Sequence, residues 1–533
     1  MVNPKNSKQG IHRRDFIKGG AAASLGLASG SFGVLNSCVQ ASEKKNAIQL
    51  ENAKPGTRDW LLTKTDVIMN EPVELWRSPR IEGYCSDTSV SAGETLKVMV
   101  STNPVSQFSL DIYRTGYYGG TGGRFMKRFD SVQGKTQTDP EIGENRLREC
   151  KWEPSVEFEI PEDWLSGVYL GKLTASEGGV QSYVIFIVRD NRPCDLLFQC
   201  SDFTWQAYNS WPTNEWSLYH DDNYDYTGYK GRKKWAGTSL NPGWVSFDRP
   251  YGQFCQDHII NRPSSVGSGE FLLWEFPLSY WLEQQGYDVS YFSNLDTHRH
   301  GKRMLKTKGF ISVGHDEYWS RQMYDNAIAA RDAGVNLVFL SGNAVCWQVP
   351  LLPSADGQDN RIIRKEALFF GEEIIREMAK QRGFKGKLPI APDAALLMGG
   401  RHAGLGGGDW ICTNPGHWLY EGTDMKEKDT IKDLVGWEWH GHPASDLPGH
   451  EILATSNAVD VRKRANSSHA ATIYNGPKDN IVFNAGCIWY AQGLSSPPGH
   501  VLPTRNGGKI QGPDPRVQRM TKNVFDRFLA KKG

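Results

Sequence analysis

The chain has 533 residues, of which 39% are hydrophobic and 23% charged, a composition typical of globular proteins and not of disordered or collagen-like chains. Its formal net charge of +1 excludes the broad positive field that nucleic-acid binding requires, so we expect no nucleic-acid partner. The length predicts more than one folded region, and no stretch offers the roughly 20 unbroken apolar residues that span a membrane.

The N-terminus has the charge order of an export signal. Arg13 and Arg14 precede a weakly apolar run over residues 19–35, which resembles a twin-arginine signal; a fortuitously basic N-terminus is the alternative. The run Leu35-Asn36-Ser37-Cys38 resembles a lipobox, so we expect a lipid on Cys38; ordinary cleavage a few residues later is the alternative. We interpret residues 1–38 as the signal and 39–59 as a tether, and expect a periplasmic protein or a membrane-anchored lipoprotein.

The other eight cysteines are scattered and form no CxxC pair. This spacing argues against a cysteine zinc site. An exported protein can form disulfides, so a Cys85–Cys150 bond and free buried cysteines both stay open.

Residues 60–190 predict a region made of β-strands. Segments 90–102, 108–120, 156–160, 167–175 and 181–190 alternate apolar and polar residues, with Gly and Pro between them. Short alternating strands at this spacing are typical of an antiparallel β-sandwich.

From residue 191 strands alternate with helices. The segments 194–202, 287–293, 309–314, 335–343 and 479–487 predict strands, and 278–286, 320–334 and 516–530 predict helices. This alternation indicates a parallel sheet covered on both faces, which we interpret as an amidotransferase-like (flavodoxin-like) α/β domain over 191–533. Residues 200–260 and 350–450 are long insertions, and such insertions often build a site.

Ligands bind outside the carboxyl ends of strands in open α/β sheets. The predicted strand 309–314 is followed by His315, Asp316, Glu317 and Tyr318, which can ligate a metal or transfer a proton. We interpret this segment as an active-site loop with His315 and Glu317 as catalytic residues. The alternative is a solvated helix start, where an acidic residue favours the helix dipole.

Two further carboxylates are candidates. Glu438 lies between two tryptophans and is followed by His440 and His442, which favours a metal ligand or a base with a raised pKa; a paired Glu on an edge strand is the alternative. Glu275 lies just before Pro277, where it is either a catalytic group or a helix cap.

Aromatic residues from Trp205 to Trp216, with Tyr219 and Tyr229, predict either a pocket wall or stacking on sugars, with packing beneath a long loop as the alternative. The glycine-rich segment 399–408 predicts a flexible loop. We assign substrate binding to Trp205, Tyr208, Asn209, Trp274, Trp319, Asn343 and His440.

Several ordered segments together resemble one known family. They are SDFTWQAYNSW, VSFDRPY, GEFLLWEFP, GYDVSYFSNLDTH, GHDEYW and LVFLSGNAVCWQV, preceded by IYRTGYYGGTGGR and PEDWLSGVYLGKLTA. In this order they resemble the large (beta) subunit family of N,N-dimethylformamidase. The resemblance covers nearly the whole chain after the signal and implies a β-sandwich followed by an amidotransferase-like α/β domain.

The resemblance also implies an amide hydrolase with one iron ion held by two tyrosines and a glutamate. Tyr318 resembles one tyrosine and Glu438 the carboxylate; the second tyrosine is expected near Glu275 to Tyr280, where Phe276 occupies the aligned position and Tyr280 is the substitute. This departure leaves another divalent metal, or no metal, open. A tyrosine with its ordinary pKa of about 10 needs a cation to become a phenolate at neutral pH, and two phenolates with a carboxylate suit a hard ion such as Fe(III).

We therefore expect a metal-dependent hydrolase of C–N amide bonds that acts on a small-molecule amide. The alternative is a non-catalytic exported lipoprotein that binds ligands or glycans in an aromatic-rich cleft. For its assembly, a homo-oligomer and a small partner subunit are both open.

Overall fold

The computed structural model describes residues 45–66, 77–213, 216–219, 243–252, 265–381, 383–444, 446–463, 467–505 and 508–530. The expected export signal, Cys38, Tyr229 and Cys255 lie outside the described residues.

Two sheets form the N-terminal part of the described chain. One has the antiparallel order β1-β3-β6, and the other has the order β2-β8-β7-β4-β5, in which only the pair β2-β8 is parallel. Val98 of the first sheet shares one hydrophobic core with Leu110 and Val184 of the second. The strands are β1 (Ile81–Cys85), β2 (Ser89–Ser91), β3 (Thr95–Thr102), β4 (Gln107–Thr115), β5 (Gly123–Gln133), β6 (Pro154–Glu159), β7 (Gly167–Ala175) and β8 (Gln181–Arg189).

A nine-stranded mixed sheet follows, in the order β11-β9-β12-β14-β23-β22-β21-β19-β20. The strands from β11 to β23 pair in parallel, and those from β23 to β20 pair antiparallel. The strands are β9 (Cys194–Cys200), β11 (Val289–Ser293), β12 (Thr307–Gly314), β14 (Asn336–Ser341), β19 (Arg401–Cys412), β20 (Thr430–Gly441), β21 (Glu451–Thr455), β22 (Ala470–Asn475) and β23 (Ile481–Asn484).

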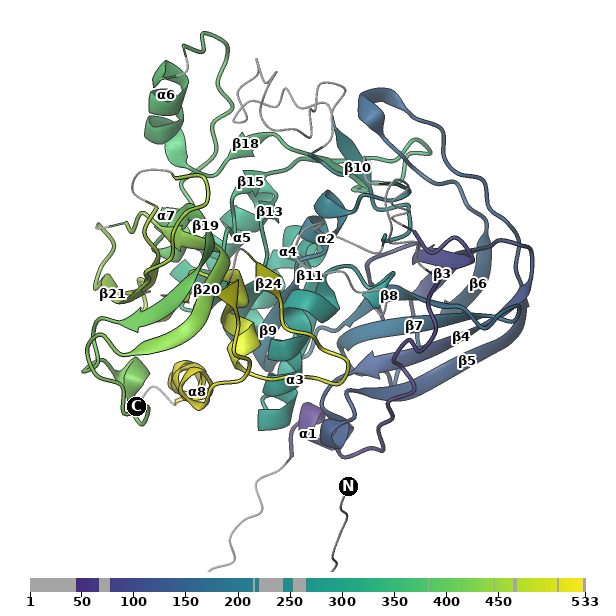
Figure 1. Ribbon diagram of the computed structural model, residues 1–533, viewed down its shortest axis with the longest axis horizontal. Coiled ribbons are helices and arrows are strands. Elements are labelled where there is room, and N and C mark those ends of the chain that lie inside the picture. Colours follow the sequence, from purple (N-terminus) through teal and green to yellow (C-terminus); the bar gives the residue numbers. More distant parts are fainter. Residues whose placement is uncertain are drawn as a thin grey trace, which may run out of the picture. The chain divides into compact units, whose positions relative to one another are not determined.

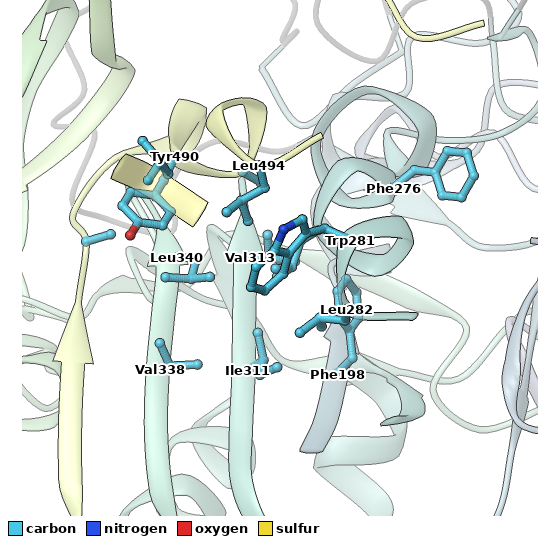
Figure 2. Packing of buried hydrophobic residues seen from close by; sticks show 14 of the residues in the cluster. Phe198, Phe276, Trp281, Leu282, Ile311, Val313, Val338, Leu340, Tyr490 and Leu494 are labelled. Carbon is cyan, nitrogen blue, oxygen red and sulfur yellow. The ribbon is translucent and has the colours of Figure 1, made fainter. Parts of the chain in front are cut away.

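Helices pack on both faces of the parallel half because its strands are apolar on both sides. Ile311 and Val338 share one core with α3 and α8, and Figure 2 shows Trp281 of α3 against Val313. The alternate residues Phe310 and Leu337 share another core with α2, α4 and α5. The helices are α1 (Ala47–Asn52), α2 (Asp202–Tyr208), α3 (Phe276–Gln285), α4 (Asn294–His300), α5 (Arg321–Asp332), α6 (Gly371–Gln381), α7 (Ala395–Met398) and α8 (Pro515–Leu529).

Short elements complete the described chain. Three small sheets have the orders β10-β17-β16, β13-β15-β18 and β24-β25. Their strands are β10 (Trp244–Ser246), β13 (Tyr318–Trp319), β15 (Trp347–Gln348), β16 (Leu351–Leu352), β17 (Ile362–Arg364), β18 (Ala367–Leu368), β24 (Thr504–Arg505) and β25 (Gly508–Lys509). A π-helical turn covers Phe271–Glu275, and 3-10 helices cover Tyr118–Gly120, Glu144–Arg146, Gly301–Lys306, Trp418–Tyr420 and Ile488–Gly493.

The N-terminal sheets and the nine-stranded sheet belong to one compact unit that starts at Lys45. A fully buried ion pair joins them, because Arg114 of β4 lies 2.8 Å from Glu283 of α3. Helix α1, within the segment expected to be a tether, also packs into this unit: the buried Glu51 carboxylate accepts a 2.8 Å hydrogen bond from the Tyr118 hydroxyl.

The mixed β and α/β architecture is confirmed, but two expectations were wrong. The sheet is parallel only from β11 to β23, and β19 and β20, which lie within the expected insertion 350–450, belong to its antiparallel half. Residues 401–412 form strand β19, paired with β20, and not a flexible loop. Its glycines allow neighbours to pack closely: a Cβ on Gly404 would lie 2.1 Å from the Trp439 ring. Cys85 and Cys150 are free and buried, so they form no disulfide. Within the described residues, no helix combines the length and apolar character needed to span a bilayer.

Candidate functional site

The segment after β12 is held in a conformation that only glycine at its start permits. Gly314 has a φ of +66°, and a Cβ there would lie 2.6 Å from the Cβ of Trp274. The next residues, His315, Asp316 and Glu317, are all buried. Strand β13 then follows and pairs with β15, so the segment is fixed at both ends.

Asp316 anchors this segment to the sheet beneath it. Its carboxylate accepts hydrogen bonds from Gln199 Nε2 at 2.6 Å, Ser312 Oγ at 2.8 Å and Asn294 Nδ2 at 2.9 Å. Burial raises the pKa of Asp316 to about 6, although these three bonds favour the ionised form. Asp316 thus fixes the backbone that carries its neighbours.

His315 lies between two carboxylates that are distant in the sequence. Its Nε2 is 3.2 Å from Glu317 Oε2 and 3.2 Å from Glu438 Oε2 on β20. One ligand atom from each of these three residues falls within 4.8 Å of the others, which is close enough to hold a metal ion. Burial alone would lower the pKa of His315, but the two carboxylates outweigh it and raise that pKa to about 10. Burial also disfavours ionised Glu438, but His315 and His402 hold its pKa well below the usual range.

Tyrosine hydroxyls gather on Glu317. The Tyr208 hydroxyl donates to Oε2 at 2.6 Å, and the Tyr219 hydroxyl donates to Oε1 at 3.2 Å. These two hydroxyls are 2.9 Å apart, and the Tyr318 hydroxyl donates to that of Tyr219 at 2.6 Å. Burial and the nearby Glu317 carboxylate raise the pKa of all three phenols well above 10, so without a cation they are neutral.

The turn that follows β14 also contributes to the site. Asn343 Nδ2 donates to Glu438 Oε2 at 2.9 Å, and the Ala344 backbone N–H donates to His440 Nε2 at 3.0 Å. His440 Nδ1 lies 3.0 Å from Asn484 Oδ1. Because a backbone N–H can only donate, His440 carries its proton on Nδ1. Burial lowers the pKa of His440 to about 3, so this neutral imidazole is held as a structural group.

The site therefore joins the carboxyl ends of β9, β12 and β14 with strand β20. In Figure 1, β13 lies between α2 and the β19–β20 pair, and α2 ends at Tyr208. The close approach of β20 to the end of β14 requires Gly342, since a Cβ there would lie 2.3 Å from the Glu438 carbonyl oxygen. The carboxyl ends of the strands are where ligands bind in open α/β sheets.

Comparison with known proteins gives the family. A family model described as N,N-dimethylformamidase beta subunit-like, C-terminal, matches residues 109–505. The chain belongs to this family.

Two curated relatives are named as N,N-dimethylformamidase beta subunits. The N,N-dimethylformamidase beta subunit of Paracoccus aminophilus is 25% identical over 245 residues, and that of Alcaligenes sp is 24% identical over 245 residues. Each match covers 39% of this chain and 29% of the relative, so this chain matches less than a third of the length of either subunit. Among solved structures, the sulfur carrier protein SoxY from Chlorobium limicola f thiosulfatophilum matches 22% of this chain and 84% of its own, with 12% identity and a TM-score of 0.12, too low to inform the fold.

Within this dimethylformamidase-like chain, the structure brings together most of the polar residues that the sequence singled out. His315, Glu317, Tyr318, Glu438 and Asn343 meet through the contacts above. Tyr208, expected to bind substrate, hydrogen-bonds Glu317 directly, whereas His440 contacts the site through the Ala344 backbone.

Tyr280 lies away from the residues that meet around Glu317. Its ring packs against Tyr117 and Phe276, with centroids 5.2 and 5.9 Å apart. Phe276 also packs against Trp60 in the same core. The expected second tyrosine at 275–280 is therefore enclosed by apolar residues of the other helix layer, because α3 packs on the opposite face of the sheet from α2.

The remaining candidates are buried in the protein. Glu275 Oε1 accepts hydrogen bonds from Trp205 Nε1 at 2.7 Å and the Ser201 backbone N–H at 3.1 Å. Asn209 uses its amide on Gln206 and on the backbone of Pro250, Trp211 and Gly252. Trp274 and Trp319 lie in two different apolar cores and are fully buried.

Sequence reasoning missed the place of Tyr219. The sequence places Tyr219 among aromatic residues that form a pocket wall or stack on sugars, whereas in the structure its hydroxyl contacts both Glu317 and Tyr318. The available signal was the position of Tyr208 and Tyr219 shortly after β9, whose carboxyl end adjoins that of β12.

Proposed function

We propose that this protein is a metal-dependent hydrolase of C–N amide bonds. The observation that carries the proposal is the convergence of the Tyr208 and Tyr219 hydroxyls on the Glu317 carboxylate at 2.6 and 3.2 Å. Membership of the dimethylformamidase-like family supports amide hydrolysis as the reaction class.

The donor set fits the single iron that the family resemblance implies. The resemblance calls for two tyrosines and one glutamate, and we assign them to Tyr208, Tyr219 and Glu317 in place of Tyr318, Tyr280 and Glu438. The phenols are neutral in this buried setting, so a strongly charged cation would be needed to remove their protons. The buried Lys365 ammonium, 3.2 Å from the centre of the Tyr219 ring, favours the same phenolate form.

A bound metal ion would polarise the amide carbonyl and increase the acidity of water. The surrounding residues supply the protons. His315 Nε2 lies 3.2 Å from Glu317 Oε2 and 3.2 Å from Glu438 Oε2, so we assign it as the acid that protonates the leaving nitrogen. In the balanced reaction water adds its hydroxyl to the carbonyl carbon and its proton to nitrogen, and the C–N bond breaks to give a carboxylic acid and an amine.

The alternative of a glycan-binding cleft has less support. Trp205 and Trp211 are both fully buried, and the indole N–H of Trp211 donates to Glu82 at 2.9 Å. Neither ring is available to stack on a sugar.

The proposal also covers the domain architecture, the export of the protein and its assembly with a partner subunit. The two N-terminal sheets are interpreted as a β-sandwich and the nine-stranded sheet with its helices as an amidotransferase-like domain. Export by the twin-arginine route, with a lipid on Cys38, is part of the same proposal because that route carries folded proteins with their cofactors. The relatives are named as beta subunits, which supports a partner subunit.

Metal analysis of protein folded in the cell tests the assignment. We expect one iron per chain, with release of an amine from small amides, and loss of both in Tyr208→Phe, Tyr219→Phe and Glu317→Gln. Tyr280→Phe is the matched control, since it removes a hydroxyl from a buried ring outside the site; it should retain metal and activity.

Two outcomes would overturn the proposal. If the Tyr208→Phe and Tyr219→Phe variants keep their metal, these phenols are not ligands. If wild-type protein holds no metal and releases no amine, the hydrolase is wrong.

A further inference from the structure

The amino ends of the parallel strands lie on the side of the sheet opposite to the site around Glu317. Thr307 at the start of β12 pairs with Cys194 at the start of β9, and Val289 at the start of β11 pairs with Leu196 of β9. We call this the amino-end side. A partner bound there lies away from the carboxyl ends of β9, β12 and β14, so it does not cover the site.

A basic segment reaches the amino-end side just before β12. Residues 297–315 contain no acidic residue, and the 3-10 helix Gly301–Lys306 in this segment ends directly before Thr307. The lysines and arginines of the segment are Arg299, Lys302, Arg303, Lys306 and Lys308. Because the whole chain has a formal net charge of only +1, the segment is a local concentration of positive charge.

An exposed leucine lies among the exposed lysines of this segment. Leu305 is 53% exposed, and Lys302, Lys306 and Lys308 are exposed as well. Lys308 pairs with Asp195 at 2.8 Å, whereas among the described residues no carboxylate pairs with Lys302 or Lys306. An apolar side chain flanked by cations suits an anionic bilayer surface, because the apolar group enters the headgroup layer and the cations attract the anionic headgroups.

The chain enters the compact unit on the same side. Asn46, at the start of α1, donates through Nδ2 to the Gly286 backbone oxygen at 2.8 Å, and Gly286 lies between α3 and β11. Cys38, the proposed site of a lipid, precedes Lys45 by seven positions, and seven extended residues reach at most about 25 Å. A bilayer that held this lipid would therefore be within reach of the amino-end side.

We propose that the amino-end side docks on an anionic phospholipid surface, with Leu305 in the headgroup layer and Lys302 and Lys306 beside the lipid phosphates. The site around Glu317 then faces away from the bilayer. Nucleic acid is disfavoured as the partner, because the positive charge is confined to one short segment with a leucine among its lysines. The inference goes beyond the proposed hydrolysis and does not depend on it.

Sedimentation with vesicles tests the inference on the full chain carrying Cys38→Ser, which has no thiol for a lipid at that position. We expect this protein to bind vesicles of phosphatidylglycerol and phosphatidylcholine, and salt to release it because exposed charges are screened. The pair Lys302→Gln and Lys306→Gln should lower the partition coefficient by about thirtyfold, the contribution of two lysines near an anionic surface. Leu305→Ser should lower it by about tenfold. Hydrogen exchange of the backbone amides in 299–308 should slow on these vesicles.

The matched control removes the same charge from α6. Lys380 and Lys385 are exposed, and Figure 1 shows α6 at the opposite end of the compact unit from α1. The pair Lys380→Gln and Lys385→Gln should bind vesicles as the Cys38→Ser protein does. Since all these positions are exposed, the variants should keep the melting temperature of that protein.

Four outcomes would overturn the inference. They are equal binding to vesicles of phosphatidylcholine alone, an equal loss of binding in the α6 control, hydrogen exchange in 299–308 that vesicles do not change, and unchanged vesicle binding in the Lys302→Gln, Lys306→Gln pair. If that pair instead changes the mass of the protein assembly in solution, the surface binds protein and the lipid inference is wrong. A failure of the hydrolase leaves all of these results unaffected.

Discussion

Glu275 makes the stability of this protein depend on pH in a direction that can be calculated. It is 1% exposed, and burial raises its pKa from 4.5 to about 8, although hydrogen bonds from Trp205 and Ser201 oppose the change. Between these two values the folded chain keeps a proton that the unfolded chain has released. Stability therefore falls as pH rises through this window.

The substitution Glu275→Gln removes this titration and keeps the oxygen that accepts from Trp205 and Ser201. Each pH unit is worth about 1.4 kcal/mol, so the free energy of unfolding of the variant relative to wild type should increase by on the order of 4 kcal/mol between pH 5 and pH 8. Urea unfolding of both proteins at several pH values gives this difference, and other groups that titrate alike in both proteins cancel.

The control is Glu157→Gln on β6, whose side chain is 55% exposed. The free energy of unfolding of this variant should change with pH in the same way as that of wild type. A difference between Glu275→Gln and wild type that stays constant from pH 5 to pH 8 would refute the reasoning, because it would place the Glu275 pKa outside this window.

Two further changes test the packing around the site. Glu283→Ala leaves the fully buried Arg114 guanidinium without its carboxylate, and we expect a loss of about 3–5 kcal/mol in urea unfolding; the double variant Arg114→Met, Glu283→Leu should lose less, and an equal loss would contradict the charge argument. Gly314→Ala introduces a Cβ 2.6 Å from Trp274 at a φ of +66°, so we expect a lower melting temperature and loss of metal. Gly119→Ala has a similar φ of +62° but open space around the new Cβ; it should be milder, and equal effects would show that the contact with Trp274 does not matter.

The local elements of the α/β region were predictable from periodicity. The apolar run before Gly314 is β12, the segment after Ser320 is α5 with a capping box on Ser320, and the last predicted helix is α8. The glycine-rich strand β19 (401–412) was not predictable from periodicity. Its pairing with β20 depends on where Trp439 packs and not on its own composition.

The sequence by itself determined the family, the strands of the parallel half of the sheet with helices α3, α5 and α8, and the loop at 315–318 as the place to look for chemistry. Only the tertiary structure decided which groups meet there: Tyr208 reaches Glu317 across 109 residues, and Glu438 and Asn343 meet across 95. It also placed Tyr280 and Glu275 inside the core. Periodicity reports which face of an element is apolar, but which loops converge depends on the order of strands in the sheet, and that order is set by contacts between distant segments.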